Sequence, residues 1–510
     1  TPAGIATQPL AAQQAAGQAA AAAAAQGYSL YTPFFYNDAD DTFLHSTSIF
    51  GEVYFNLTSN LKLTGGVRHN WDTKGTRQRG NLLESASPTN PAILTDPAHF
   101  PPVVPIGTPS VRPLLDTNEL VQCQPLGSFC PTGGVNDFQV VRGNFDATTG
   151  RAVLQWTPSE DLQIYASWTR GFKPGGFNPR TLFANVPLTY RPEIIKAYEA
   201  GIKSRPSRTM QLNLTGFYYD YTDLQVSRIV ANTSVNDNIN AKIYGIEGEW
   251  VWQPVEDLTF NANASYLHTK IGDFSAIDVR NPTAGLSAFG ADGVVLLADL
   301  TNGSNCVVQL NGGPNIINPA VTLASLNAAL AAGAPALAAG FDALTSGPFT
   351  ICSSLQSLLN TPQIPTGLGL ISLNQALGTN FQVIDGIETS AKGNELPGSP
   401  KFNIAGGVQF NIHMGPHFLI TPRVDAYYQS RMFTNIFNTL QDRVNGYGYL
   451  NAQVRFHPSD ANWYIRAFVQ NLTDNNAVTG AFDVGQGAGN FQNIFILEPR
   501  RYGIGAGFSF

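Results

Sequence analysis

Hydrophobic and polar positions alternate with a period of two through several segments of about ten to eighteen residues, longer than most strands of globular proteins. In residues 258–266, for example, the apolar Leu258, Phe260 and Tyr266 alternate with polar residues such as Asn261. The same alternation recurs in residues 49–57, 162–169 and 402–411. Each segment therefore has one apolar and one polar face, which predicts paired antiparallel β-strands.

The connections between these segments alternate between short turns and longer stretches. From Ser46 to Phe510 the pattern predicts about 13 strands, and residues 27–36 could supply a fourteenth. We therefore expect an Ala-rich extracellular loop or tail over residues 1–45 and one strand domain over residues 46–510, with large loop insertions at about 75–137 and 273–396. The Ala- and Leu-rich residues 318–344 predict short helices in the second insertion, which is either a surface decoration or a ligand-capturing loop.

The composition favours a membrane barrel. Charged residues make up 13% of the chain, against about 25% in soluble domains, whereas aromatic residues reach 11% and glycines number 49. A mean hydropathy of −0.07, without any run of about 20 apolar residues, excludes a helical membrane protein. The net charge of −7 argues against a nucleic-acid partner. We predict an all-β fold, a transmembrane antiparallel β-barrel with long extracellular loops; a soluble β-protein is the alternative.

Charged side chains occur on the faces opposite the apolar positions. In a dry core each unpaired ion would cost several kcal/mol, so we expect these residues to face a wet lumen or to pair with a polar domain inside it. Their mixed signs argue against a selectivity ring of one charge. The lumen-facing candidates are Glu52, Lys62, Arg68, Glu199, Lys203, Glu247, Glu249, Arg423, Asp425, Arg455 and Arg466.

The four cysteines fall into two pairs, Cys123 with Cys130 and Cys306 with Cys352, each within one long connection. In an oxidising compartment each pair could close a disulfide inside its own loop. A metal site is the alternative, and it is disfavoured because neither a Cys-x-x-Cys motif nor clustered histidines accompany the cysteines.

Enzyme signatures are missing from the sequence. It contains no His-Glu-x-x-His zinc motif, no phosphate-binding Gly-x-x-x-x-Gly-Lys-Ser/Thr loop and no Gly-x-Ser-x-Gly nucleophile turn. We therefore predict no catalytic residues, no metal ligands and no cofactor. Aromatic residues instead mark the ends of the apolar bands, where they would anchor strands at the two membrane interfaces. These residues are Trp156, Trp168, Trp250, Trp252, Tyr427, Tyr428, Trp463 and Tyr464.

Several segments, in this order along the chain, resemble the C-terminal part of the barrel of TonB-dependent outer-membrane receptors. They are residues 164–178 (IYASWTRGFKPGGFN), 191–203 (RPEIIKAYEAGIK), 217–225 (FYYDYTDLQ), 244–249 (YGIEGE), 396–401 (LPGSPK), 469–474 (VQNLTD) and 498–503 (EPRRYG). The chain end is also similar to the signal by which outer-membrane barrels are recognised for assembly, with Tyr502, Ile504, Phe508 and Phe510 on one face.

The resemblance implies a bacterial outer-membrane location and a barrel of about 22 strands with a plugged lumen. It also implies active uptake of a scarce bulky nutrient, such as a metal chelate or a glycan, energised through TonB and its inner-membrane complex if a plug lies upstream. Further partners would be the outer-membrane assembly machinery, lipid and an unknown small-molecule ligand. Because the sequence shows neither a plug nor a TonB-box segment, we expect a truncated chain. A self-contained passive channel is the alternative, followed by a soluble secreted β-rich binding protein.

Overall fold

The computed structural model describes most of the strand-forming segments of the chain. The described residues are 33–85, 111–113, 139–178, 187–230, 233–278, 280–286, 294–298, 305–310, 360, 364–366, 369–372, 374–375, 380–384, 386–460, 462–483 and 492–508. They are almost entirely β-strand, which confirms the predicted all-β fold class.

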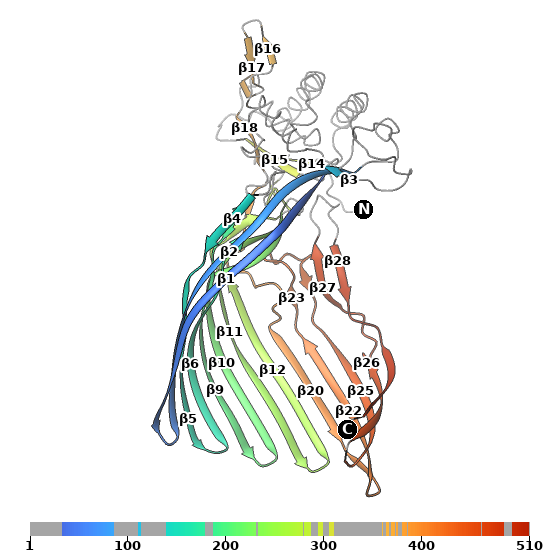
Figure 1. Cartoon of the computed structure of the whole chain (residues 1–510). Coiled ribbons are helices and arrows are strands. Elements are labelled where there is room, and N and C mark those ends of the chain that lie inside the picture. Colours follow the sequence, from blue (N-terminus) through green and yellow to red (C-terminus); the bar gives the residue numbers. More distant parts are fainter. Residues whose placement is uncertain are drawn as a thin grey trace.

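Sixteen strands form one antiparallel sheet, in which neighbours in space are nearly always neighbours in sequence (Figure 1). Its main path runs through β1 (Pro33–Thr58), β2 (Leu61–Ser85), β5 (Ala147–Ser159), β6 (Leu162–Lys173), β9 (Glu193–Ser207), β10 (Met210–Val230), β11 (Thr233–Val255), β12 (Leu258–Ile271), β20 (Phe402–Phe410), β22 (Phe418–Gln429), β25 (Tyr447–Pro458), β26 (Trp463–Gln470) and β29 (Arg501–Phe508). Outside this path, β3 (Val111–Pro113) and β4 (Gln139–Asn144) pair with β2, and β21 (Ile412–Met414) pairs with β22. Within the described residues β1 and β29 each pair along one side, so they are the two edges of the sheet.

Tight turns join the strands at the lower end of Figure 1, and the long connections leave from the upper end. Several strands continue well past the about 9–11 residues that cross a membrane: β10 has 21 residues and β11 has 23. Two sequence-based boundaries need correction. β1 begins at Pro33 rather than near Ser46, so residues 33–36 are part of the first strand and not of a separate one; β2 runs to Ser85, past the expected loop start at residue 75.

Two-stranded and three-stranded sheets occupy the long connections. They are built from β7 (Gly176–Phe177), β8 (Thr189–Tyr190), β13 (Ser275–Ile277), β14 (Val294–Ala298), β15 (Asn305–Leu310), β16 (Ile364–Thr366), β17 (Gly369–Ile371), β18 (Phe381–Ile384), β19 (Glu388–Ser390), β23 (Met432–Phe433), β24 (Arg443–Val444), β27 (Val478–Asp483) and β28 (Gln492–Ile496). The insertion at 273–396 therefore contains β-structure in its described parts, whereas the helices expected at 318–344 lie outside the described residues.

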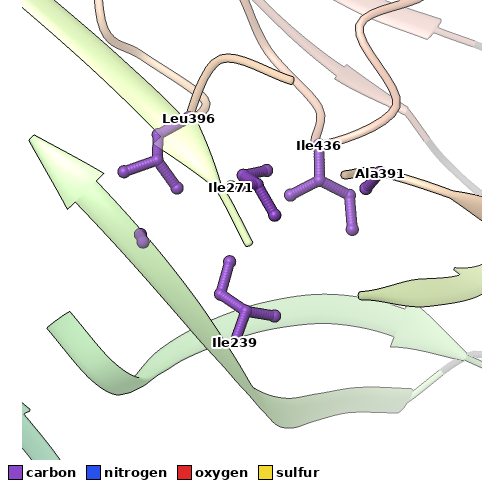
Figure 2. Packing of buried hydrophobic residues seen from close by; sticks show 6 residues of the cluster. Ile239, Ile271, Ala391, Leu396 and Ile436 are labelled. Carbon is purple, nitrogen blue, oxygen red and sulfur yellow. The ribbon is translucent and has the colours of Figure 1, made fainter. Parts of the chain in front are cut away.

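A small hydrophobic core lies where the long connections leave the sheet (Figure 2). Ile239 of β11 and Ile271 of β12 pack with Ala391, Leu396 and Ile436 from two connections. The cluster is buried because these side chains come from two strands and two connections and cover one another. It joins the connection after β12 to the connection after β22.

Candidate functional site

The pairing register places all eleven predicted lumen-facing residues on one face of the sheet, which we call the polar face. The register can be followed from strand to strand: Lys203 lies opposite Asn213, Asn213 opposite Glu249, and Glu249 opposite Asn263. On the same face Asp425 lies opposite Gly407. This common placement follows from the period-two alternation, since a cross-strand pair always points to one side of a sheet.

At the first strands the polar face carries a two-pronged ion pair. Arg151 of β5 donates from Nε to Glu52 Oε2 (2.8 Å) and from Nη2 to Glu52 Oε1 (2.7 Å), reaching across β2. Gly66, which lies between the two residues in the register, leaves room for the Glu52 carboxylate. Sequence reasoning missed Arg151 because its partner is 99 positions away.

A second network spans β12, β20 and β22. Arg423 donates from Nε to Asp425 Oδ2 (2.9 Å) and from Nη2 to Asn261 Oδ1 (2.9 Å). The network crosses β20 at Gly407, where an added Cβ would lie 2.4 Å from Asp425 Oδ1 and 2.5 Å from Arg423 Nη2. A glycine is needed here because two charged side chains approach the backbone closely.

Acidic side chains accept hydrogen bonds in the middle of the sheet. The Tyr219 hydroxyl donates to Glu199 Oε1 (2.7 Å), and Asn213 Nδ2 donates to Glu249 Oε2 (3.2 Å). Glu247 lies between them, opposite Thr215. The hydrogen bonds therefore hold the Glu199 and Glu249 carboxylates in position on the polar face.

The remaining cations of the polar face contact aromatic rings or amides. Lys62 Nζ lies 4.6 Å from the centre of the Tyr54 ring, and Lys203 Nζ lies 5.8 Å from that of Tyr165. Arg68 Nε donates to Asn70 Oδ1 (2.6 Å). Arg455 and Arg466 lie directly opposite each other on β25 and β26.

The opposite, apolar face carries exposed hydrophobic side chains and a row of aromatic residues. Trp168, Tyr198, Tyr218 and Tyr244 are successive cross-strand neighbours on β6, β9, β10 and β11. Such a row is the arrangement expected of an aromatic girdle at a membrane interface.

The predicted girdle is wrong for two of its members. Tyr427 donates a hydrogen bond to Asn403 Oδ1 (3.0 Å) on the polar face, and Tyr464 lies under the Arg455 guanidinium. Aromatic residues are frequent on both faces of strands, so their presence near a strand end does not determine the face on which they lie.

At the end with the long connections, buried charges fix two of these segments. Asp442 is completely buried and accepts from Arg280 Nη1 at Oδ1 (2.6 Å) and from Arg280 Nη2 at Oδ2 (3.1 Å). Asp278 Oδ1 accepts from Arg280 Nε (3.2 Å). Burial alone would lower the pKa of the Arg280 guanidinium, but the hydrogen bonds and charges of Asp442 and Asp278 raise it, so the group stays ionised.

Two other sets of predicted residues are only partly described. Cys123, Cys130 and Cys352 lie outside the described residues, and Cys306 lies on β15, so both disulfides stay predictions. Tyr502, Ile504 and Phe508 share one face of β29 with exposed fractions of 70% or more, whereas Phe510 is outside the described residues. Their role in assembly also stays a prediction.

Neither a metal centre nor a spanning helix is found in the described part of the chain. There, no group of three or more His, Cys, Asp or Glu side chains is placed to hold a metal ion. Among the same residues, no helix has the length and hydrophobicity to cross a membrane.

The family model for the TonB dependent receptor-like β-barrel matches residues 8–294, more than half of the chain. The chain belongs to the TonB-dependent receptor β-barrel family. This confirms the resemblance that the sequence motifs indicated. Members of this receptor family are outer-membrane β-barrels of Gram-negative bacteria, so this chain is an outer-membrane protein.

Solved outer-membrane receptors are similar to this chain at low sequence identity. The ferric yersiniabactin uptake receptor FyuA from Yersinia pestis is 13% identical, with a TM-score of 0.52 over 93% of this chain and 46% of that receptor. The siderophore receptor PiuA from Acinetobacter baumannii is 12% identical, with a TM-score of 0.46 over 91% of this chain and 56% of that receptor. The chain thus spans about half the length of the solved receptors that it matches.

Proposed function

We propose that this chain is the barrel portion of an outer-membrane active-transport receptor, which takes up a scarce bulky nutrient such as a metal chelate or a glycan with energy delivered through TonB. Membership of the receptor family is the observation that carries the proposal. The similar receptor FyuA takes up ferric yersiniabactin, which makes a metal chelate the first class to test.

The polar face supports the proposal because it is suited to the inside of a barrel. Its charges have mixed sign, and many are held by neighbours, as in the Arg151–Glu52 and Arg423–Asp425 pairs. In this proposal the polar face borders the barrel interior, where it contacts water or a polar plug. The protein would capture and move its ligand without making or breaking covalent bonds, so we propose a transport receptor rather than an enzyme.

The proposed partners follow from the same mechanism. TonB and its inner-membrane complex would supply energy through a plug, and a small molecule would be the cargo. The outer-membrane assembly machinery would insert the barrel, with lipid against the apolar face.

Uptake measurements in cells test the proposal. Two kinds of probe are used, a ⁵⁵Fe-labelled chelate such as ferric citrate or a ferric catecholate, and a ¹⁴C-labelled oligosaccharide. We expect accumulation of one of them to fall about tenfold when the gene is deleted. It should fall equally when TonB is removed, because transport in this family is energised through TonB. Restoring the gene should restore uptake. Accumulation that needs the protein but continues without TonB would overturn the proposal in favour of a passive channel, and so would unchanged accumulation of every probe after gene deletion.

A further inference from the structure

Two arginines on the polar face lie side by side near the rim with the short turns. Arg455 of β25 is directly opposite Arg466 of β26 in the register. Arg455 lies three residues before the end of β25 at Pro458, and Arg466 three residues after the start of β26 at Trp463. Like charges directly opposite each other in a sheet are destabilising, so this pair requires an explanation.

The charges of these two arginines are not matched within the described part of the chain. Neither side chain forms an ion pair with a described carboxylate, and Arg455 Nε is buried without a hydrogen-bond acceptor. The nearest arginine on β22, Arg423, is by contrast already paired with Asp425. The rim of the polar face at β25 and β26 therefore carries two positive charges that no described carboxylate pairs with, and one buried donor without a partner, which costs free energy.

Aromatic rings and a glycine border the two guanidinium groups. The Arg455 guanidinium lies 4.3 Å from the centre of the Tyr464 ring, and that of Arg466 lies 5.1 Å from the centre of the Phe468 ring. The residue opposite Arg466 on β29 is Gly505, which has no side chain to cover the Arg466 stem; a Cβ there would lie 3.2 Å from Arg466 Nε. Ring contacts of this kind order the planar groups without neutralising them.

We propose that Arg455 and Arg466 form a binding site for an oxyanion, a carboxylate or phosphate group of a small molecule. Two guanidinium groups offer several N–H donors in fixed planes, which suits two-pronged binding of such a group. An anion bound by both groups would offset the like-charge repulsion. The proposed site depends on this geometry alone. The further step, that an anionic cargo binds there as it leaves at the short-turn rim, also rests on the proposed function.

Anion binding to the folded protein tests the site directly. Citrate and inorganic phosphate are titrated separately by calorimetry into the purified protein in detergent, at low and at high salt. We expect saturable binding of at least one anion, and about a tenfold or greater loss of affinity in the Arg455→Gln/Arg466→Gln variant, because the two-pronged donors are gone. The Arg455→Lys/Arg466→Lys variant keeps the charge but loses the planar donors, so its affinity should fall between the two.

Arg501→Gln is the matched control, since it removes the same charge from neighbouring β29 at an arginine that is paired with Glu498; its affinity should stay within about twofold of wild type. Heat-dependent gel migration verifies that each variant is folded. The bound anion should also raise the urea midpoint of the wild type and leave that of the double glutamine variant unchanged.

Unchanged affinity in the double glutamine variant, or no binding and no midpoint shift in the wild type, would overturn the site. Anion binding is measured without transport, so its result is separate from that of the uptake test. If the protein binds an anion but the uptake test fails, the proposed function is overturned and the site is not. If uptake occurs but no anion binds, the site is overturned and the proposed function is not.

Discussion

Replacing Asp442 with alanine is expected to destabilise the packed connections above the sheet by about 2–4 kcal/mol, somewhat less than the cost of a buried charge left without any counter-charge, because Arg280 keeps Asp278. The Asp442 carboxylate is completely buried and accepts hydrogen bonds from Arg280, from the Thr439 amide (2.9 Å) and from the Thr439 hydroxyl (2.8 Å). Its removal takes the two-pronged partner away from the Arg280 guanidinium, which is only 12% exposed and keeps its contact with Asp278.

Hydrogen exchange measured peptide by peptide is the appropriate readout, because the loss should open residues 432–444 and 272–286 locally before the sheet unfolds. The control is Asp273→Ala, which removes an aspartate from the connection after β12, the connection that carries Arg280. Asp273 is 83% exposed and pairs with an exposed Lys392, so its loss should leave exchange nearly unchanged. Equal exchange in the two variants would show that the buried charges do not fix these connections.

Arginine at Leu214 is expected to reduce the stability of the membrane-inserted protein by about 2–4 kcal/mol, the cost of a cation on the lipid side of a barrel near the bilayer midplane. Leu214 is on the apolar face of β10, is 48% exposed, and lies between the aromatic girdle at Tyr218 and the short turn before Met210. Its neighbours in the register, Ile202 and Gly248, offer no counter-charge.

The adjacent residue provides a matched control. Asn213 lies on the polar face and donates to Glu249, so the Asn213→Arg variant should be close to wild type because the new cation meets an existing carboxylate. Urea unfolding in lipid vesicles, followed by tryptophan fluorescence, measures both variants. A larger loss at Asn213 than at Leu214 would mean that the two faces of the sheet have been assigned the wrong way round.

The sequence was sufficient to predict the strand faces, for a physical reason. A period of two leaves each strand only two possible faces, and an apolar series such as Leu258, Phe260 and Tyr266 identifies one of them. Once the apolar face of a strand is identified, the residues between its members must lie on the other face. The pairing register places all eleven charged candidates on a single face. This part of the candidate site depends on local alternation alone.

Pairings across the sheet and between connections were beyond the sequence. Glu52 meets Arg151 across an intervening strand, and Arg280 meets Asp442 over 162 positions of chain. Such contacts depend on which strands become neighbours and on how the connections fold back, neither of which an alternating pattern encodes.

The upper ends of the strands were also missed, because strand pairing there continues without apolar alternation. In β11 the polar Asn236, Asp237 and Asn238 still pair with β10, so the hairpin continues beyond the alternating part of the strand. A membrane-facing pattern marks only the part of a strand that crosses the bilayer.

We expect the apolar face to contact lipid and the polar face to border the barrel interior. The oxygen accessibility of spin labels along β11 in outer-membrane lipid tests this most directly. Labels are placed one at a time at residues 246–250 in a background with serine at the four native cysteine positions. We predict high oxygen accessibility at Ile246, Gly248 and Trp250 and low accessibility at Glu247 and Glu249. Accessibility that is uniform along the strand, or higher at Glu247 and Glu249, would contradict the account.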